Sequence, residues 1–267
     1  MSPHSFAVPL SRRARQILNN KTDNHDIFQG PTATTRSTMN NHQPAHGPLP
    51  LHRTPCPIHP IYNLHHIQTV GMDCPYKHQQ YHWPSVSGTA NNALIGDSLI
   101  KYIKDLDDTE VHAYPGTKLE WITQKIQNGN IKLHGYKIIV FHLGCNNLRH
   151  QETNKIVELF EELLLLSKTR NDSAAIVLSL IIPWNNETPD QKHKRETLNT
   201  QLRKLVLKLG KGFYYFQSWK AMYDKITKEL VQSFYTDDNV HLKRGGVRAL
   251  RDSIDGNIKI LKGKLKK

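Results

Sequence analysis

Residues 138–148, which read IIVFHLGCNNL, decide the fold class. The first six residues form an almost continuous apolar run, which is typical of a strand buried on both faces of a parallel sheet. The glycine and the asparagines that follow are common turn residues. The segment therefore predicts a central, buried strand that ends in a polar turn.

Strands and helices alternate on both sides of this segment. Short apolar runs predict four further strands, at 93–95, 111–114, 174–182 and 213–216. Apolar residues at helical spacing predict five helices, over 99–106, 117–127, 154–168, 189–209 and 247–261. Such alternation is typical of right-handed βαβ units around a parallel sheet that is covered on both faces. We therefore expect a three-layer α/β/α sandwich with a mostly parallel, five-stranded sheet.

The first 83 residues differ in composition from the rest of the chain. They hold ten of the 16 histidines and ten of the 14 prolines, and they lack helical or strand periodicity. Such a segment buries too little apolar surface to offset the entropy lost on ordering. We expect a disordered, His- and Pro-rich tail over 1–83, dispensable for folding, and one folded domain over 84–267.

The tail also offers an alternative in metal binding. Cys56 with His59, and Cys74 with His78, are residue types that bind zinc. Their spacing matches no familiar zinc motif, and His-rich sequence produces such matches often. A zinc site in the tail stays open as a hypothesis.

The charge of the chain is strongly positive. The net charge is +13, and residues 84–267 contribute 29 basic and 20 acidic residues, or +9. This excess suits an anionic partner such as nucleic acid, and it suits solubility equally well. We expect weak, salt-sensitive nucleic-acid binding without sequence preference, with Lys243, Arg244 and Arg248 as the first residues to test.

Cysteine content and hydropathy bear on location. Three cysteines do not make a disulfide framework, and no stretch is apolar enough to span a bilayer. The N-terminal residues lack the apolar core of a secretory signal. We expect an intracellular, cytoplasmic location, while three early arginines leave nuclear or mitochondrial targeting open: Arg12, Arg13 and Arg15. The oligomeric state is not indicated.

Polar residues follow the predicted strands where functional groups of α/β sheets gather, at the strands' carboxyl ends. Ser98 follows the first strand, Gly116 the second and Asn146 the third, while Asp238 and His241 precede the last helix. Each alone has an ordinary explanation as a helix cap, a turn residue or a surface ion pair. Together they could supply a nucleophile, an oriented base and oxyanion donors.

In these residues the chain resembles the SGNH hydrolases, also called GDSL esterases and lipases. Four blocks over 94–250 carry the resemblance: Gly96-Asp97-Ser98-Leu99, Pro115-Gly116-Thr117, Gly144-Cys145-Asn146-Asn147 and Asp238-Asn239-Val240-His241-Leu242. The third block usually reads Gly-Thr-Asn-Asp, so Cys145 and Asn147 are departures, but neither belongs to the catalytic set. The domain as a whole is similar to the short animal SGNH domains, some of which are carried by retroelements.

The resemblance implies a flavodoxin-like sheet and an ester hydrolase. Ser98 would be the nucleophile, His241 its base and Asp238 the residue that orients the imidazole. The N–H groups of Ser98 and Gly116 and the Asn146 amide would form the oxyanion hole. The implied reaction hydrolyses a small-molecule or lipid ester through an acyl-enzyme, and it needs no metal and no organic cofactor.

A binding module on the same fold is the alternative, because fold does not fix function. Some SGNH-like domains have lost their triad and bind RNA, and the positive charge favours a catalytically weak or silent module of this kind. The complete set of Ser98, Asn146, Asp238 and His241 favours catalysis. The sequence does not identify the acyl group or the alcohol, and we expect the loops at 184–191 and 219–235 to select the substrate.

Overall fold

The computed structural model describes residues 80–85 and 88–266. Two predictions fall largely or wholly outside these residues. They are the disordered tail and the zinc hypothesis on Cys56, His59, Cys74 and His78.

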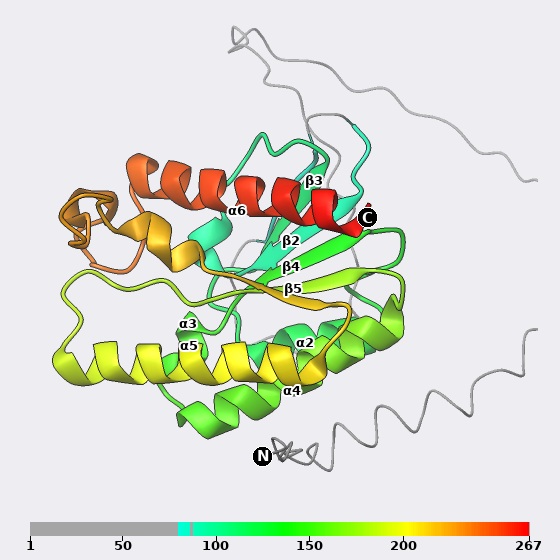
Figure 1. The fold of residues 1–267 in the computed structure, drawn as a ribbon, viewed down its shortest axis with the longest axis horizontal. Helices are drawn as coiled ribbons and strands as arrows, with labels where there is room; N and C mark the ends of the chain where they lie inside the picture. The colour runs from blue at the N-terminus through cyan, green and yellow to red at the C-terminus, as the bar shows by residue number, and fades with distance from the viewer. Residues whose placement is uncertain (1–79, 86–87, 267) are drawn as a thin grey trace, which may run out of the picture. The chain divides into compact units, whose positions relative to one another are not determined.

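The described residues form an α/β fold around one six-stranded sheet (Figure 1). The strands are β1 (Tyr81–Trp83), β2 (Asn92–Gly96), β3 (Thr109–Ala113), β4 (Ile138–His142), β5 (Ala175–Ser179) and β6 (Phe213–Phe216). Their order is β1-β3-β2-β4-β5-β6, and β2 to β6 pair in parallel. All five expected strands are thus confirmed, and their order is the flavodoxin-like one.

The sixth strand, β1, was not expected and lies within the range assigned to the tail. Tyr81, His82 and Trp83 pair antiparallel with β3. The indole Nε1 of Trp83 also donates a hydrogen bond to the Lys101 carbonyl at 2.8 Å. The sheet therefore includes residues before the expected boundary at 84. A strand of three residues is too short to show a period in the sequence.

The main helices are α2 (Leu119–Gln127), α4 (Thr153–Arg170), α5 (Pro189–Leu209) and α6 (Arg244–Leu265). In Figure 1, α2, α4 and α5 lie on one side of the sheet and α6 lies on the other, as expected for three layers. Local sequence explains α5 well. Thr188 and Gln191 form a capping box, Pro189 occupies the first turn, and Gly210 ends the helix with a φ of 77°. No helix among the described residues is long and apolar enough to cross a membrane.

Two short elements differ from the expectation. The helix expected over 99–106 is only the 3-10 turn η1 (Ser98–Ile100), and Asp105 and Asp108 adopt left-handed φ values of 56° and 54°. Its helix-like apolar spacing has another cause, because Leu99, Ile100, Ile103 and Leu106 are all buried in the core. Conversely, the turn expected after β4 forms the short helix α3 (Cys145–Leu148).

The core lies around the central strands and fixes the carboxyl edge of the sheet. Every residue of β2, β4 and β5 is buried, because helices cover both faces. Gly96, the last residue of β2, pairs with Ala113 at the end of β3 and with His142 at the end of β4. Three strands therefore end at the same level, and the chain segments that follow them start side by side.

Candidate active site

Strand register brings three of the predicted site segments to one edge of the sheet. Ser98, Gly116 and Asn146 each follow, within a few residues, one of the three strand ends that pair at Gly96. Backbone hydrogen bonds extend the pairing beyond the strands, from Tyr114 N–H to the Gly96 carbonyl at 2.8 Å. The edge lies where the strand order reverses, between β2 and β4, which is where ligands bind in sheets of this type.

Ser98, His241 and Asp238 form a continuous chain of hydrogen bonds. The Nε2 of His241 lies 3.0 Å from the Ser98 hydroxyl oxygen. On the other side of the ring, Nδ1 lies 2.6 Å from Oδ2 of Asp238. Because one carboxylate oxygen accepts from Nδ1–H, the neutral imidazole presents an unprotonated Nε2 to the serine, as a general base requires.

Several donors hold the Asp238 carboxylate. Its Oδ1 accepts from the Thr236 hydroxyl at 2.6 Å and from the backbone N–H groups of Val240 and His241, each at 2.9 Å. The hydrogen bond from Thr236, followed by that from His241, lowers the pKa of Asp238 well below its ordinary value. Asp238 is half-exposed, and these donors keep it ionised in the orientation that faces His241.

The loop that carries Asp238 and His241 is anchored to the loop after β5. Asn239 adopts a left-handed φ of 62°, and its carbonyl accepts from the Asn185 N–H at 2.9 Å. The Asn185 side chain donates to Oδ1 of Asn239 at 2.8 Å. Asn185 is thus a positioning residue that sequence reasoning missed, because it lies 54 residues away from its partner and carries no motif.

A buried ion pair holds the loop after β5, which carries Asn185. Arg195 on α5 donates to Glu187 through Nε at 2.7 Å and through a second guanidinium nitrogen at 2.8 Å. Their side chains are only 2% and 6% exposed. Glu187 also accepts from the N–H of Trp184 at 3.1 Å, so the pair ties α5 to the loop that holds Asn185.

Gly116 and Asn146 belong to a second hydrogen-bonded group. Gly116 has a φ of 76°, a conformation that favours glycine, and it lies in a turn closed by Thr117 N–H and the Tyr114 carbonyl. One N–H of the Asn146 side chain donates to the Thr117 carbonyl at 2.8 Å. No hydrogen bond among the described residues joins this group to Ser98 or His241. The two groups follow strands that end at the same level of the sheet, and neither Gly116 nor Asn146 lines the pocket beside Ser98.

Asn147, one of the two departures from the family pattern, has a structural role. Its Oδ1 accepts from the N–H of Leu119 at 3.0 Å, at the start of α2, and its Nδ2 donates to Glu120 at 2.8 Å. It is fully buried and links α3 to α2. The other departure, Cys145, is a buried free thiol whose pKa is raised by burial.

The residue before the serine is a buried acid. Asp97 is 1% exposed, and its Oδ1 accepts from the N–H of Leu99 at 3.0 Å, which caps η1. Its other oxygen has no hydrogen-bond partner among the described residues. Burial raises the pKa of Asp97 to about 6. The sequence signals only a helix cap here, not a carboxyl group that can hold a proton.

A second buried titratable group, His142, ends β4. Its Nδ1 lies 2.9 Å from the Ser179 hydroxyl, which donates to Ser218 at 2.9 Å. Burial lowers the pKa of His142 to about 4, so it is neutral at physiological pH. These bonds join β4, β5 and η2 (Ser218–Met222), and we assign His142 a structural role.

A pocket of about 450 Å³ opens beside the serine. It is lined by Ser98, Leu99, Lys101, Tyr102, Thr236, Asp237, Asp238, His241, Leu242 and Val247. The loops expected to select the substrate, 184–191 and 219–235, do not line it. Trp184 and Tyr235 are buried, and the Tyr235 hydroxyl donates to the Pro183 carbonyl at 2.8 Å. The lining residues come instead from the segment just after Ser98 and from the segment around His241.

Comparisons with known proteins identify the fold. No protein-family model matches the chain, and no curated protein matches it. Among solved structures, a GDSL-like lipase from Bacteroides thetaiotaomicron matches with a TM-score of 0.51 and 14% identity, over 64% of this chain and 88% of that one. A carbohydrate esterase of family 3 from Talaromyces cellulolyticus matches with a TM-score of 0.52 and 16% identity, over 65% and 98%.

A third match has the same character. An acetylxylan esterase from Geobacillus stearothermophilus matches with a TM-score of 0.51 and 11% identity, over 62% of this chain and 93% of that one. At these identities the likeness concerns the fold and not the chemistry. The chain has the SGNH hydrolase fold.

Proposed function

We propose that the protein is a serine esterase that hydrolyses a carboxylic ester through an acyl-enzyme on Ser98. The observation that carries this proposal is the hydrogen-bonded chain from Ser98 through His241 to Asp238, with distances of 3.0 and 2.6 Å. Two of these residues are 143 positions apart in the sequence, so chance proximity explains the chain poorly. Its position at the carboxyl edge of the sheet supports the same conclusion.

In each half of the proposed reaction, acylation and then deacylation, His241 accepts one proton and then donates it. Nε2 takes the proton of the Ser98 hydroxyl as the oxygen attacks the ester carbonyl, and then gives it to the departing alcohol. Water next attacks the acyl-enzyme, giving a proton to Nε2, and Ser98 regains that proton as the carboxylic acid leaves. Asp238 stays ionised throughout and stabilises the imidazolium.

The oxyanion would be bound by three donors. These are the N–H groups of Ser98 and Gly116 and the second N–H of the Asn146 side chain, whose first N–H is fixed on Thr117. A donor aimed at the developing charge contributes about 3 kcal/mol to the transition state. The single hydrogen bond between Asn146 and Thr117 therefore matters, because it fixes the direction of the amide.

The pocket favours a small, partly polar substrate. Its lining combines apolar groups from Leu99, Tyr102, Leu242 and Val247 with polar groups that include Lys101. Its volume of about 450 Å³ is at the lower end of the range for small-ligand sites. We therefore expect short acyl esters to be hydrolysed faster than long-chain ones.

The test compares p-nitrophenyl esters of increasing chain length on the full chain. We expect hydrolysis of the acetate to be lost in Ser98→Ala and retained in Ser233→Ala, a matched change at an exposed serine of η3 (Gln232–Phe234). Both variants should keep the wild-type circular dichroism spectrum. Equal hydrolysis by wild type and a folded Ser98→Ala variant would overturn the proposal.

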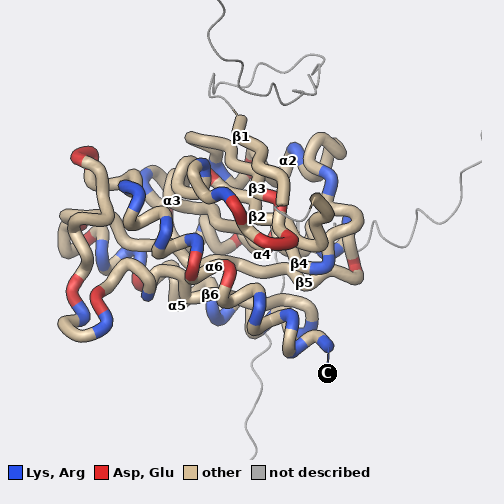
Figure 2. The backbone as a smooth tube through the Cα atoms, turned by 90° about the horizontal axis from the view of Figure 1, so that it is seen from above, with Lys and Arg blue, Asp and Glu red and all other residues tan. Residues whose placement is uncertain are grey.

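A second candidate function, the binding of nucleic acid, has its own supporting observation. A pocket of about 890 Å³ at the amino ends of β2, β4 and β5 is lined by five lysines: Lys137, Lys168, Lys211, Lys262 and Lys266. Figure 2 also shows basic positions along α6 and close to its C-terminal end. Part of this charge is already compensated, because Lys262 pairs with Asp108 at 2.7 Å.

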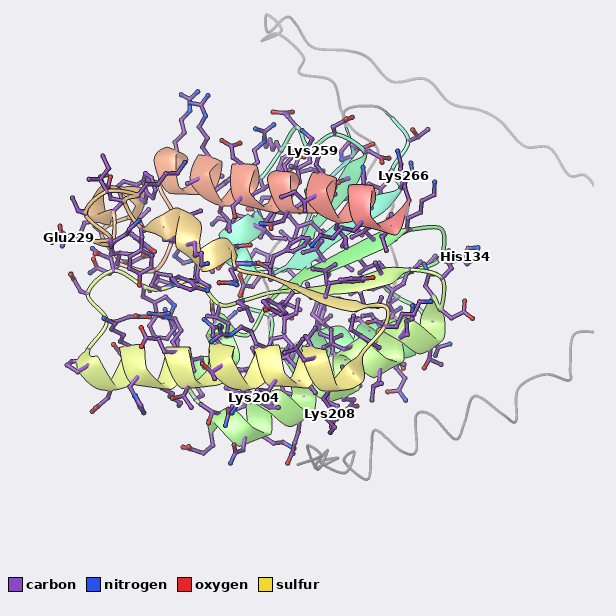
Figure 3. The ribbon with its side chains drawn as sticks, viewed as in Figure 1. His134, Lys204, Lys208, Glu229, Lys259 and Lys266 are labelled. Carbon is purple, nitrogen blue, oxygen red and sulfur yellow. The ribbon has the colours of Figure 1, made fainter. Side chains whose placement is uncertain are left out.

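The two basic regions can be separated by mutation. We expect Lys137→Glu/Lys211→Glu to weaken the binding of single-stranded nucleic acid and to reduce its salt dependence. Arg244→Glu/Arg248→Glu, at the exposed start of α6, tests the region named from the sequence. The control is Lys204→Glu on α5 (labelled in Figure 3). Binding that is unchanged in both charge-reversal pairs would exclude this second candidate.

A further inference from the structure

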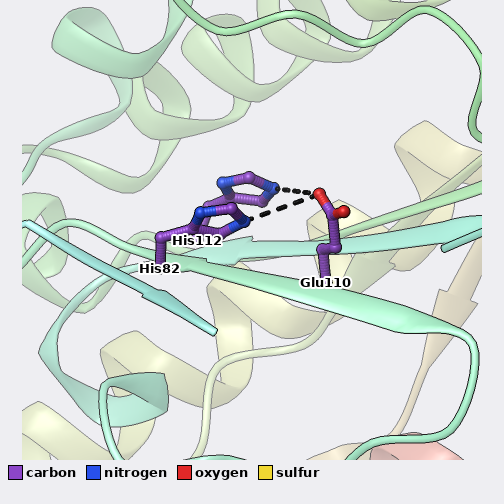
Figure 4. A group of neighbouring side chains, drawn as sticks. All are labelled: His82, Glu110 and His112. Carbon is purple, nitrogen blue, oxygen red and sulfur yellow. Dashed lines mark ion pairs between the residues drawn. The ribbon is translucent and has the colours of Figure 1, made fainter. Parts of the chain in front are cut away.

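The pairing of β1 with β3 places three metal-ligand side chains together (Figure 4). His82 and His112 are direct partners in the antiparallel ladder, and their rings stack nearly parallel, at 12° with centroids 4.5 Å apart, so one ring must turn for both Nε2 atoms to bind one ion. Glu110 lies two residues before His112 on β3, and therefore on the same face of the sheet. None of the three belongs to the hydrogen-bonded chain of Ser98.

The distances between these groups fit a shared metal ion better than hydrogen bonds. The Nε2 atoms of His82 and His112 lie 3.6 and 3.4 Å from the same oxygen, Oε2 of Glu110. Hydrogen bonds from nitrogen to oxygen measure about 2.7–3.2 Å, so both separations are too long. In a tetrahedral zinc site with bonds of about 2.1 Å, neighbouring ligand atoms lie about 3.4 Å apart.

We propose that His82, Glu110 and His112 bind one divalent transition-metal ion, with zinc as the best fit. All three ligand atoms lie within 4.8 Å of one another. Two imidazoles and one carboxylate form a ligand set that zinc takes in proteins, with a fourth position for water or another ligand. Calcium and magnesium prefer oxygen ligands only, so the two histidines disfavour them.

Tyr136 supplies the outer contact that such sites require. Its hydroxyl donates to Oε2 of Glu110 at 2.6 Å and lies 3.4 Å from Nε2 of His112. A hydrogen bond of this kind fixes the orientation of a metal-binding carboxylate. The carboxylate can bind the ion and accept this bond together.

The ion would join β1 to the rest of the sheet. The strand has only three residues, and His82 at its centre would be bonded through the ion to two side chains of β3. Because β3 leads directly to the loop of Gly116, the ion would also stiffen the strand before that loop. The role we infer, joining β1 to β3, does not depend on the esterase proposal.

The experiment titrates the full chain with Zn²⁺ by calorimetry, with a chelator-treated sample at the start. The tail cysteines and histidines can add sites of their own, so the decisive quantity is the difference between variants. His82→Ala, whose side chain is 58% exposed, and His112→Ala should each lose one zinc equivalent. Tyr136→Phe should weaken the same site about 10- to 100-fold.

The matched control is His134→Ala, a change at an exposed histidine in the turn before β4 (labelled in Figure 3). It should bind as much zinc as wild type, and so should Ser98→Ala. Zinc should also raise the melting temperature of wild type more than that of His82→Ala. Equal zinc stoichiometry and affinity in wild type, His82→Ala and His112→Ala would overturn the proposal.

Discussion

The buried carboxyl group of Asp97 should make the stability of the fold depend on pH. Burial raises the pKa of Asp97 from 3.8 to about 6. The folded state therefore holds this proton more tightly than the unfolded state. The resulting stability is fully present below pH 3.8 and is lost as pH rises through about 6. This difference between the two pKa values corresponds to about 3 kcal/mol of unfolding free energy over the full pH range.

Asp97→Asn isolates this effect. The asparagine keeps an oxygen that can accept from the N–H of Leu99, but it carries no charge at any pH. The difference in unfolding free energy between wild type and variant should shift by about 2.4 kcal/mol against wild type between pH 4 and pH 7, because the unfolded carboxyl is already partly ionised at pH 4. Most of this change should fall between pH 4 and pH 6.

The assay is urea denaturation of the full-length proteins at unit steps from pH 4 to pH 8, followed by circular dichroism. Asp190→Asn, on the exposed first turn of α5, controls for the loss of one negative charge. A difference between wild type and Asp97→Asn that does not change with pH would refute the reasoning. A difference of the opposite sign would refute it too, because Asp97 would then be stabilised as the anion.

Three other predictions concern groups near the site. Burial lowers the pKa of His142 from 6.5 to about 4, so the unfolding free energy of wild type should fall by about 3 kcal/mol relative to that of His142→Gln as pH falls from 6.5 to 4. Acid unfolding of both proteins at the same midpoint pH would contradict this. Arg195→Met should destabilise the fold by about 3–5 kcal/mol in thermal melts, because it leaves Glu187 buried and unpaired; a melting temperature equal to wild type would argue against it. Because the Thr236 hydroxyl holds Asp238, Thr236→Val should lower kcat about tenfold with little change in KM, and Thr236→Ser should keep the wild-type kcat. A Thr236→Ser variant as slow as Thr236→Val would show that the packing of the threonine methyl group matters instead.

Much of the fold is readable from local sequence. The apolar run at 138–142 forms the central strand β4, and α5 spans the predicted range of 189–209. The strand is a continuous apolar run, and the helix is long enough to show a helical period. The apolar spacing at 99–106 indicated a helix wrongly, because burial in the core produces the same pattern.

The pieces that sequence reasoning missed depend on contacts between distant segments. β1 exists only because β3 supplies its partner, so the cluster of His82, Glu110 and His112 has no sequence signature. The role of Asn185 likewise depends on its hydrogen bond to Asn239, a residue distant in the sequence. The residues of the proposed triad could be named beforehand because each lies in a short block of fixed residue types. Their mutual geometry required the folded chain.

The most direct measurement of the central proposal is labelling with a fluorophosphonate probe, read by mass spectrometry of the modified peptide. We expect a single adduct on Ser98 in wild type and none in His241→Ala, whose serine has lost its base. Ester hydrolysis should fall equally in Ser98→Ala, in His241→Ala and in the double variant, because the two residues act as one unit. A wild-type protein that is folded by circular dichroism, yet neither reacts with the probe nor hydrolyses any activated ester, would contradict the account.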